Sequence, residues 1–298
     1  MQRSDCTLAE LPLAPPLPFP PGLDEAALVA LFQTYELDNA PRPEMENYWR
    51  HDWKRFVYTY GLIANSSGKC RELGANPYFT TLLLKFFTSL ELTLANYFGP
   101  NFSAVARQQV TIKNPRTGKI ETHSMEFSHF NVEDEEFPFS SATFDFVLFC
   151  EVIEHLQRDP VRVLREIQRI LRHNGVLILT TPNVSRLENI ARMLAGANIY
   201  DPYSGYDPYG RHNREYNKHE LVRLLEYCGY AVEIIFAADV HANLTQNFFP
   251  IDGLIGLVIG RKHDLGQYLF VRARKAVPPR LRRPSWLYRS HPAEMLDE

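Results

Sequence analysis

Short apolar runs alternate with amphipathic segments along most of the chain. Apolar runs rich in Val, Ile, Leu and Phe are typical of buried strands, and apolar positions spaced three and four apart are typical of helices. Strands are predicted at residues 69–73, 91–98, 144–150, 175–183, 231–240 and 267–275. Helices are predicted at residues 77–90, 152–171 and 217–230, with Pro160 marking a break or restart in the second of them. Residues 106–132 indicate two more strands, joined by the turn residues Asn-Pro-Arg-Thr-Gly-Lys.

The alternation of strands and helices predicts the fold class. Parallel strands need a long crossover connection, usually a helix, so this pattern favours an α/β fold with a mostly parallel sheet and helices on both faces. Ligands of such sheets bind beyond the carboxyl ends of the strands. Apolar spacing also predicts helices between residues 23 and 62, interrupted at residues 40–43. We therefore expect a Pro-rich arm and helical cap (1–60), a main domain (61–275) and a basic tail (276–298).

Composition and charge narrow the classes of partner. The 298 residues are 45% hydrophobic and 12% aromatic, which is ample for a packed core. A net charge of −3 gives no overall attraction to nucleic acid or anionic membrane. Residues 271–291 nevertheless hold seven arginines and lysines and no acid. We expect this tail to be a solvated, Pro-broken extension, with contact to a polyanion as the alternative.

Cysteines and apolar stretches bear on location. The four cysteines are far apart and form no CxxC pair, which favours a reducing compartment. The proline-dense residues 11–22 do not make a signal-peptide core. The apolar residues 253–260 are too few to span a bilayer. We expect a cytosolic protein without a membrane span.

Four stretches in fixed order carry a family resemblance. "RELGANP" spans the end of the strand predicted at 69–73, and "ELTLAN" lies in the strand predicted at 91–98. "FPFSSATFDFVLFCEVIEHL" surrounds the strand at 144–150, the family's fourth, and "VLREIQRILRHNGVLILTTPN" leads into the strand at 175–183, the family's fifth. Together they resemble the class I S-adenosylmethionine-dependent methyltransferases, over roughly residues 55–275. The resemblance implies a Rossmann-like, seven-stranded, mostly parallel sheet with an N-terminal helical cap. It also implies S-adenosyl-L-methionine as the cofactor.

The same resemblance implies a cofactor site at the strand ends. Gly74 is the one glycine in a loop where related proteins have more, and Asn96 replaces the acid that usually binds the ribose hydroxyls. The residues implied to bind the cofactor are Glu72, Gly74, Asn76, Asn96, Asn131, Glu133, Cys150 and Glu151. Each of these also fits a structural role, such as a turn residue or a strand-end cap. A nicotinamide-binding site is disfavoured because it normally has three glycines and an acid after the second strand.

The "EVIEHL" stretch at residues 151–156 has a second resemblance. It is similar to the ExxEH motif of metal-dependent small-RNA 3′-terminal 2′-O-methyltransferases and of ubiquinone-pathway O-methyltransferases. The RNA enzymes have a further histidine downstream, where "RHNREY" places His212. This implies a metal site of Glu151, Glu154, His155 and His212, suited to Mn²⁺, Fe²⁺, Co²⁺ or Zn²⁺ better than to Mg²⁺.

Other roles for these residues stay open at this point. His155 or His212 could act as a metal-free general base, because imidazole titrates near the working pH. Glu151 could contact the cofactor or cap a following helix. Glu154 and His155 could belong to a structural hydrogen-bond network.

We expect methyl transfer to a hydroxyl oxygen, because no Asn-Pro-Pro-Tyr sequence, typical of transfer to amino groups, follows the fourth strand. The expected acceptor is a small or medium hydroxylated molecule, a saccharide or a natural-product intermediate, with the Tyr-rich residues 198–216 shaping its pocket. One alternative is an RNA 2′-O-methyltransferase, although the acidic total and the lack of an RNA-binding module oppose a nucleic acid partner. Another is a non-catalytic relative. The apolar insertion at residues 247–262 favours extra core or a dimer contact, so a homodimer is an open alternative.

Overall fold

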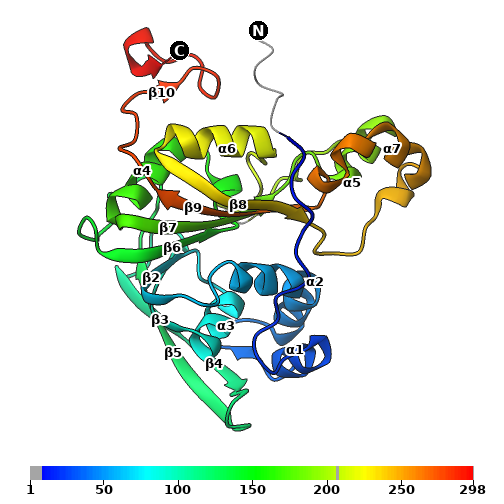
Figure 1. The fold of residues 1–298 in the computed structure, drawn as a ribbon. Coiled ribbons are helices and arrows are strands. Elements are labelled where there is room, and N and C mark those ends of the chain that lie inside the picture. The colour runs from blue at the N-terminus through cyan, green and yellow to red at the C-terminus, as the bar shows by residue number, and fades with distance from the viewer. Residues whose placement is uncertain (1–8, 206–207, 298) are drawn as a thin grey trace.

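The computed structural model describes residues 9–205 and 208–297. Within these residues the central sheet has nine strands, in the order β1-β4-β5-β3-β2-β6-β7-β9-β8 (Figure 1). Their bounds are β1 Glu36–Leu37, β2 Ser67–Leu73, β3 Ser89–Asn96, β4 Val105–Lys113, β5 Ile120–His129, β6 Phe144–Cys150, β7 Leu171–Pro182, β8 Tyr230–Ala238 and β9 Tyr268–Lys275. A separate parallel pair joins β10 Arg283–Pro284 and β11 Leu296–Asp297.

The predicted mostly parallel sheet is confirmed. Strands β5, β3, β2, β6 and β7 pair in parallel, and β9 runs antiparallel between β7 and β8. The sheet exceeds the expected seven strands because β4 pairs antiparallel with β5 and β1 pairs with β4 at the same edge. The chain leaves β2 toward β3 on one side and later returns as β6 on the other. The strand order therefore reverses at β2, which is where ligands of such sheets bind.

Helices cover both faces of the sheet, as the sequence predicts. In Figure 1, α1, α2 and α3 lie on one side of the sheet, and α4 and α6 lie on the other. The helices are α1 Glu25–Phe32, α2 Arg42–Gly61, α3 Phe79–Phe87, α4 Pro160–Ile170, α5 Leu187–Leu194, α6 Lys218–Tyr227 and α7 Ile251–Leu257. Short 3₁₀ turns are η2 Ile153–His155, η3 Pro208–Gly210, η4 Thr245–Asn247, η5 Ile259–Asp264 and η6 Ala293–Met295.

The sheet separates two apolar cores. Along β7, Leu177 and Leu179 belong to the core under α4 and α6, and Ile178 between them belongs to the core under α2 and α3. All three are fully buried. Successive side chains of a strand point to opposite faces, so a strand covered on both sides is apolar throughout. This explains why β6 and β7 were visible in the sequence as continuous apolar runs.

The helix predicted to begin at residue 152 is interrupted. Ile153–His155 forms one 3₁₀ turn, and α4 begins only at Pro160. Glu151 has a left-handed φ of +54°, so the chain turns sharply out of β6 instead of entering a helix. Asp159 caps α4 by accepting a hydrogen bond from the Arg162 N–H at 3.0 Å. Glu151, Glu154 and His155 therefore do not share a helix face.

The basic tail packs on the domain, so the expected solvated extension is wrong. Tyr288 is only 8% exposed and donates its hydroxyl to Asp159 at 2.7 Å. Arg283 pairs with the same carboxylate at 2.5 Å, and Arg223 lies over the Trp286 ring at 4.5 Å. The aromatic side chains within the tail anchor it, because burying a large ring stabilises more than solvating the nearby charges.

The apolar insertion at residues 247–262 is mostly exposed, so of the two expected roles extra core is wrong and a dimer contact stays a prediction. Leu254 of α7 is buried, but Leu257 is 77% exposed and Ile259 is 67% exposed. In the part of the chain that the structure describes, no helix is both long and apolar enough to cross a membrane.

Candidate active site

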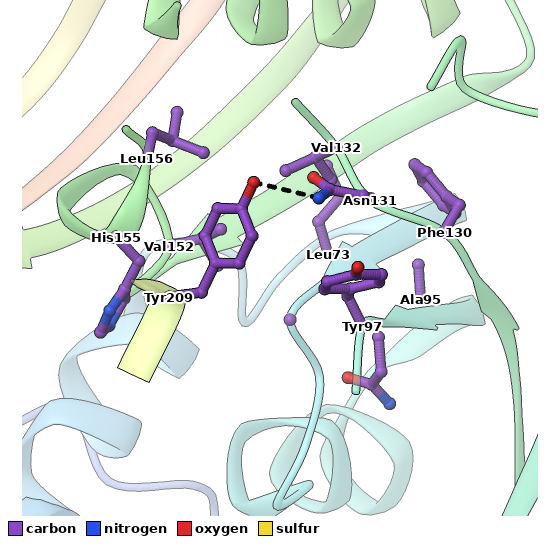
Figure 2. Close-up of a pocket in the computed structure, with 12 residues that line it drawn as sticks. Leu73, Ala95, Tyr97, Phe130, Asn131, Val132, Val152, His155, Leu156 and Tyr209 are labelled. Carbon is purple, nitrogen blue, oxygen red and sulfur yellow. Dashed lines mark hydrogen bonds between the residues drawn. The ribbon is translucent and has the colours of Figure 1, made fainter. Parts of the chain in front are cut away.

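A cavity of about 170 Å³ lies at the carboxyl ends of β2 and β3, where the strand order reverses. We call it the cofactor cavity. Four of the predicted site residues line it, namely Gly74, Asn96, Asn131 and His155. The rest of its lining is apolar or aromatic: Leu73, Ala95, Tyr97, Phe130, Val132, Val152, Leu156 and Tyr209 (Figure 2). Few polar groups among apolar walls are typical of a small-molecule site.

Gly74 makes the first loop possible. Its φ is +74°, and a Cβ added there would lie 2.6 Å from Cγ2 of Val152. Its N–H donates to the carbonyl of Ala95 at 2.9 Å, which ties the loop to the end of β3. Glycine is therefore required both by the backbone conformation and by the close approach of the η2 segment.

Asn96 organises the same loop. Its Oδ1 accepts from the Asn76 N–H at 2.8 Å, and its Nδ2 donates to the Tyr78 hydroxyl at 3.1 Å. The Asn76 side chain donates to Gln108 at 3.1 Å and does not line the cavity. These two hydrogen bonds use one lone pair of Oδ1 and one N–H of Nδ2, so the Asn96 amide keeps one further lone pair and one further N–H for a ligand. The loop is held by amides in place of the additional glycines.

Asn131 and Glu133 form hydrogen bonds with neighbouring protein groups. Asn131 Nδ2 donates to Asp134 and to the Tyr209 hydroxyl, each at 3.0 Å. The Glu133 carboxylate accepts from the backbone N–H groups of residues 157, 158 and 159 at 2.8 to 3.1 Å. Glu133 thus holds the segment between η2 and α4 in place, and it is not among the residues that line the cavity.

Glu72 and Cys150 lie beneath the cavity lining. Glu72 is 5% exposed and accepts from the Thr81 hydroxyl at 2.6 Å. Burial raises the pKa of Glu72 from its ordinary 4.5 to about 7, although the Thr81 hydrogen bond opposes the change. The Cys150 thiol is 3.9 Å from the Ile178 carbonyl, and burial raises its pKa. Neither side chain lines the cavity.

The cap helix α2 contacts the site through Arg55. Its guanidinium lies 3.4 Å from Glu151 and 3.1 Å from Asp52, and it is almost fully buried. Glu151 also accepts from the Thr180 hydroxyl at 2.7 Å. Burial raises the pKa of Glu151, with the positive charge of Arg55 opposing the change. This carboxylate is therefore paired with the cap.

Three of the four predicted metal ligands converge. Glu154, His155 and His212 each offer a ligand atom within 4.8 Å of the other two. We call them the histidine cluster. Glu151 is not part of it. The two imidazole rings have centroids 5.0 Å apart, and Glu154 Oε1 is 3.9 Å from His155 Nε2.

Both imidazoles of the histidine cluster are oriented by other groups. His155 Nδ1 lies 2.9 Å from the Arg211 carbonyl, and His212 Nδ1 lies 3.0 Å from Glu215 Oε1. A carbonyl or carboxylate partner fixes the proton on Nδ1 and leaves the Nε2 lone pair free. Burial, and then His212, lower the pKa of His155. Burial opposes charging of His212, but the Glu215 hydrogen bond and the negative charges of Asp201, Glu215 and Glu151 together outweigh burial and raise the pKa of His212.

Glu154 is the unusual member of the histidine cluster. It is fully buried, and its Oε2 accepts from the Thr181 hydroxyl at 3.0 Å. Its Oε1 is buried without any hydrogen-bond partner among the described residues. Burial raises the pKa of Glu154 well above its ordinary range, and the Glu151 carboxylate adds to the effect. A buried oxygen without a partner is costly, so the site calls for a proton or a cation.

Two tyrosines of the cavity, Tyr97 and Tyr209, were not predicted individually. Tyr97 stacks on His129 at 5.2 Å and meets Tyr209 edge-on at 6.0 Å. Figure 2 shows the Tyr209 hydroxyl turned toward Asn131. Tyr97 directly follows Asn96 at the end of β3, so its position in the sequence was the available signal. Tyr209 belongs to the Tyr-rich stretch but had no signal of its own.

Comparison with known proteins finds similarity to methyltransferases. A family model described as a methyltransferase domain matches residues 67–234, more than half of the chain. A probable S-adenosylmethionine-dependent methyltransferase of Mycobacterium tuberculosis is 28% identical over 216 residues, covering 71% of this chain and 65% of that relative. The chain thus spans just under two thirds of the length of this relative.

Solved structures resemble the chain more distantly. One comes from the complex between the Haloferax volcanii Trm112 methyltransferase activator and the putative methyltransferase, with 16% identity, a TM-score of 0.49, and coverage of 79% of this chain and 93% of that one. Another is a possible histamine N-methyltransferase of Thermotoga maritima, with 16% identity, a TM-score of 0.46, and coverage of 78% and 95%. The family match supports S-adenosyl-L-methionine as the cofactor. The chain belongs to the methyltransferase domain family, as its strand-end motifs predict.

Proposed function

We propose that this protein transfers a methyl group from S-adenosyl-L-methionine to a hydroxyl oxygen of a small or medium acceptor, such as a saccharide or a natural-product intermediate. The observation that carries the proposal is the histidine cluster beside the cofactor cavity. His155 lines that cavity, and its ring contacts the ring of His212, with centroids 5.0 Å apart. A hydroxyl held at the histidine cluster would therefore lie next to a donor held in the cofactor cavity.

The cofactor cavity offers what an adenosyl group needs. Gly74 lines the cavity without a side chain, so its backbone can contact a ligand directly. Phe130, Val132 and Tyr97 provide apolar walls for a planar base. Asn96 retains hydrogen-bonding capacity for a sugar hydroxyl. Glu72, Asn76, Glu133 and Cys150 would support this site from beneath or beside it.

The histidine cluster fits a divalent cation. One carboxylate oxygen without a hydrogen-bond partner and two imidazoles form a donor set typical of Zn²⁺, Mn²⁺, Fe²⁺ or Co²⁺. The separation of up to 4.8 Å is somewhat wider than around a shared ion with bonds of about 2.1 Å, so a small contraction is needed. A bound cation would lower the pKa of an acceptor hydroxyl and hold its oxygen in place.

The chain's own residues then orient and deprotonate the acceptor. The hydroxyl oxygen takes the methyl group from the sulfonium sulfur, the sulfur–methyl bond breaks, and the products are a methyl ether and S-adenosylhomocysteine. The hydroxyl proton must leave the oxygen. In a metal-free site it would pass to Nε2 of His155 or His212 as general base. Arg211 and Glu215 keep these rings in the orientation that the transfer needs.

Metal analysis tests the donor set. We expect wild-type protein reconstituted with Zn²⁺ or Mn²⁺ to keep one ion per chain after dialysis, and Glu154→Ala and His212→Ala to lose it. His241→Ala is the matched control, since His241 lies outside the histidine cluster. Equal metal content in all four proteins would remove the metal site and favour His155 or His212 as a metal-free base.

Cofactor binding tests the reaction class. S-adenosylhomocysteine at 100 times its dissociation constant should stabilise the fold by about 2.7 kcal/mol, visible as a raised melting temperature. No stabilisation at saturating ligand would contradict the enzyme and favour a non-catalytic binding module. Transfer of labelled methyl to a hydroxylated acceptor, abolished in His155→Ala, completes the test.

A further inference from the structure

Two more cavities lie on the His212 side of the molecule, and the first of them adjoins the histidine cluster. The first, of about 360 Å³, includes His212, Asp201, Arg214, Glu215 and Glu220 in its wall, and we call it the polar cavity. The second, of about 380 Å³, we call the apolar cavity. Its lining is mainly Val184, Ile190, Met193, Ile199, Val258 and Leu265. Both volumes are in the range of small-molecule sites.

The cavities follow one another in space. Val184 and Ile199 line both the polar and the apolar cavity, so the two cavities are adjacent and share part of their wall. His212 lines the polar cavity, and its ring contacts His155, which lines the cofactor cavity. The order is therefore cofactor cavity, histidine cluster, polar cavity and apolar cavity.

The two ends of this path suit different chemical groups. The polar cavity presents carboxylates, amides and a guanidinium, which can exchange hydrogen bonds with several hydroxyl groups. The apolar cavity presents aliphatic side chains, which gain free energy by covering a hydrocarbon chain. A sugar or glycerol head alone would leave the apolar cavity facing water.

Exposed apolar side chains surround the apolar cavity. Met193 of α5 is 56% exposed, Leu257 of α7 is 77% exposed and Ile259 of η5 is 67% exposed. Figure 1 shows α5 and α7 side by side at one corner of the molecule, away from the sheet. Clustered exposed apolar residues mark binding surfaces in soluble proteins. Met193 lines the apolar cavity, and Leu257 and Ile259 flank its lining residue Val258 in the sequence. Exposed apolar surface therefore lies beside the cavity, where a chain longer than the cavity could continue.

We propose that the methyl acceptor is amphipathic, with a hydroxylated head in the polar cavity and an acyl or isoprenoid chain in the apolar cavity. The position of the reacting hydroxyl rests on the proposed function. The apolar chain site rests on cavity geometry alone. Because the apolar cavity lies directly beside the polar cavity, a chain that is part of the acceptor is favoured over a second copy of this protein or a membrane surface.

Direct binding of a chain probe tests the apolar cavity. We use 11-(dansylamino)undecanoic acid, whose fluorescence rises in an apolar site, and titrate it into the full chain without cofactor. Met193→Asp and Val258→Asp should each weaken binding about tenfold or more, because a carboxylate would enter an apolar wall. Met193→Leu should retain binding. Leu281→Asp is the matched control, since Leu281 is 88% exposed and does not line the cavity.

The outcomes separate this inference from the proposed function. Stabilisation by S-adenosylhomocysteine without probe binding overturns the chain site and leaves the proposed function intact. Probe binding that is lost in Met193→Asp supports the chain site even where S-adenosylhomocysteine fails to bind, which contradicts only the proposed function. Probe binding unchanged in both aspartate variants overturns the inference. Sedimentation with phosphatidylcholine vesicles, without probe binding, also overturns it and indicates a membrane-docking face.

Discussion

Glu72 should make the stability of this protein depend on pH in an unusual direction. Glu72 is the second-last residue of β2 and is 5% exposed. Its carboxyl group accepts a hydrogen bond from the Thr81 hydroxyl. Burial disfavours its charged form and raises the pKa from 4.5 to about 7. In the unfolded chain the group is solvated and ionises at its ordinary value. Replacing it by glutamine removes the ionisation and keeps a similar shape.

The size and sign follow from the two pKa values. The folded state holds the proton more tightly, so the unfolded state binds fewer protons between about pH 4.5 and pH 7 and stability falls as the pH rises through that window. The full difference corresponds to about 3 kcal/mol, at 1.36 kcal/mol per tenfold change in proton affinity. More than about 2 kcal/mol of it should appear between pH 5 and pH 8. Below pH 4.5 the group is protonated in both states and contributes nothing to the slope.

Urea unfolding at pH 5 and pH 8 measures this effect. We expect the stability of Glu72→Gln relative to wild type to increase by about 2 kcal/mol or more between the two pH values. Taking the difference between the two proteins cancels other titrating groups. Glu91→Gln, an exposed carboxylate on the neighbouring strand β3, is the control and should show no such change. A Glu72→Gln difference that stays constant or reverses sign would refute the reasoning.

Two further substitutions test the loop and the cap. Gly74 and Gly196 both have a φ of +74°, but an added Cβ meets a neighbour only at Gly74. Gly74→Ala should therefore cost more stability than Gly196→Ala, and only Gly74→Ala should weaken S-adenosylhomocysteine binding in calorimetry. Equal binding losses would contradict this. Arg55→Met should destabilise by about 3–5 kcal/mol in urea unfolding, because it leaves buried carboxylates unpaired. Arg50→Met, in an exposed pair on the same helix, should change stability by less than about 1 kcal/mol, and comparable losses would count against the Arg55 network.

The fold was predictable where a sequence pattern fitted only one type of secondary structure. The apolar run at 144–150 became β6 because both faces of that strand are buried, so no polar alternation obscured it. The predicted restart at Pro160 is where α4 begins, with Asp159 as its cap, but the residues from 152 to 159 were wrongly included in the helix. The apolar spacing before Asp159 comes from a 3₁₀ turn that packs into the same core. The docked tail was hidden because charge dominates its composition.

The site was predictable in position but not in the partners of each side chain. Strand ends gave Gly74, Asn96, Asn131 and His155 at the cavity, because parallel strands place their carboxyl ends at one edge. Which partner each polar group takes depends on segments far apart in sequence. Glu133 accepts from the backbone 24 to 26 residues later, and no periodicity carries that information. The Tyr-rich stretch was identified as one unit for the same reason.

One loop links the whole proposed site. Tyr209, Arg211 and His212 lie within four residues, and they reach the cofactor cavity, the His155 ring and the polar cavity respectively. The loop is fixed to η2 because the N–H groups of residues 213 and 214 donate to the Glu154 carbonyl at 2.8 and 3.1 Å. Docking of this loop therefore orients His155 and delivers His212 in the same step. A ligand that contacts this loop from the acceptor side would also act on the histidine cluster and on the Tyr209 wall of the cofactor cavity, so donor and acceptor binding should be cooperative.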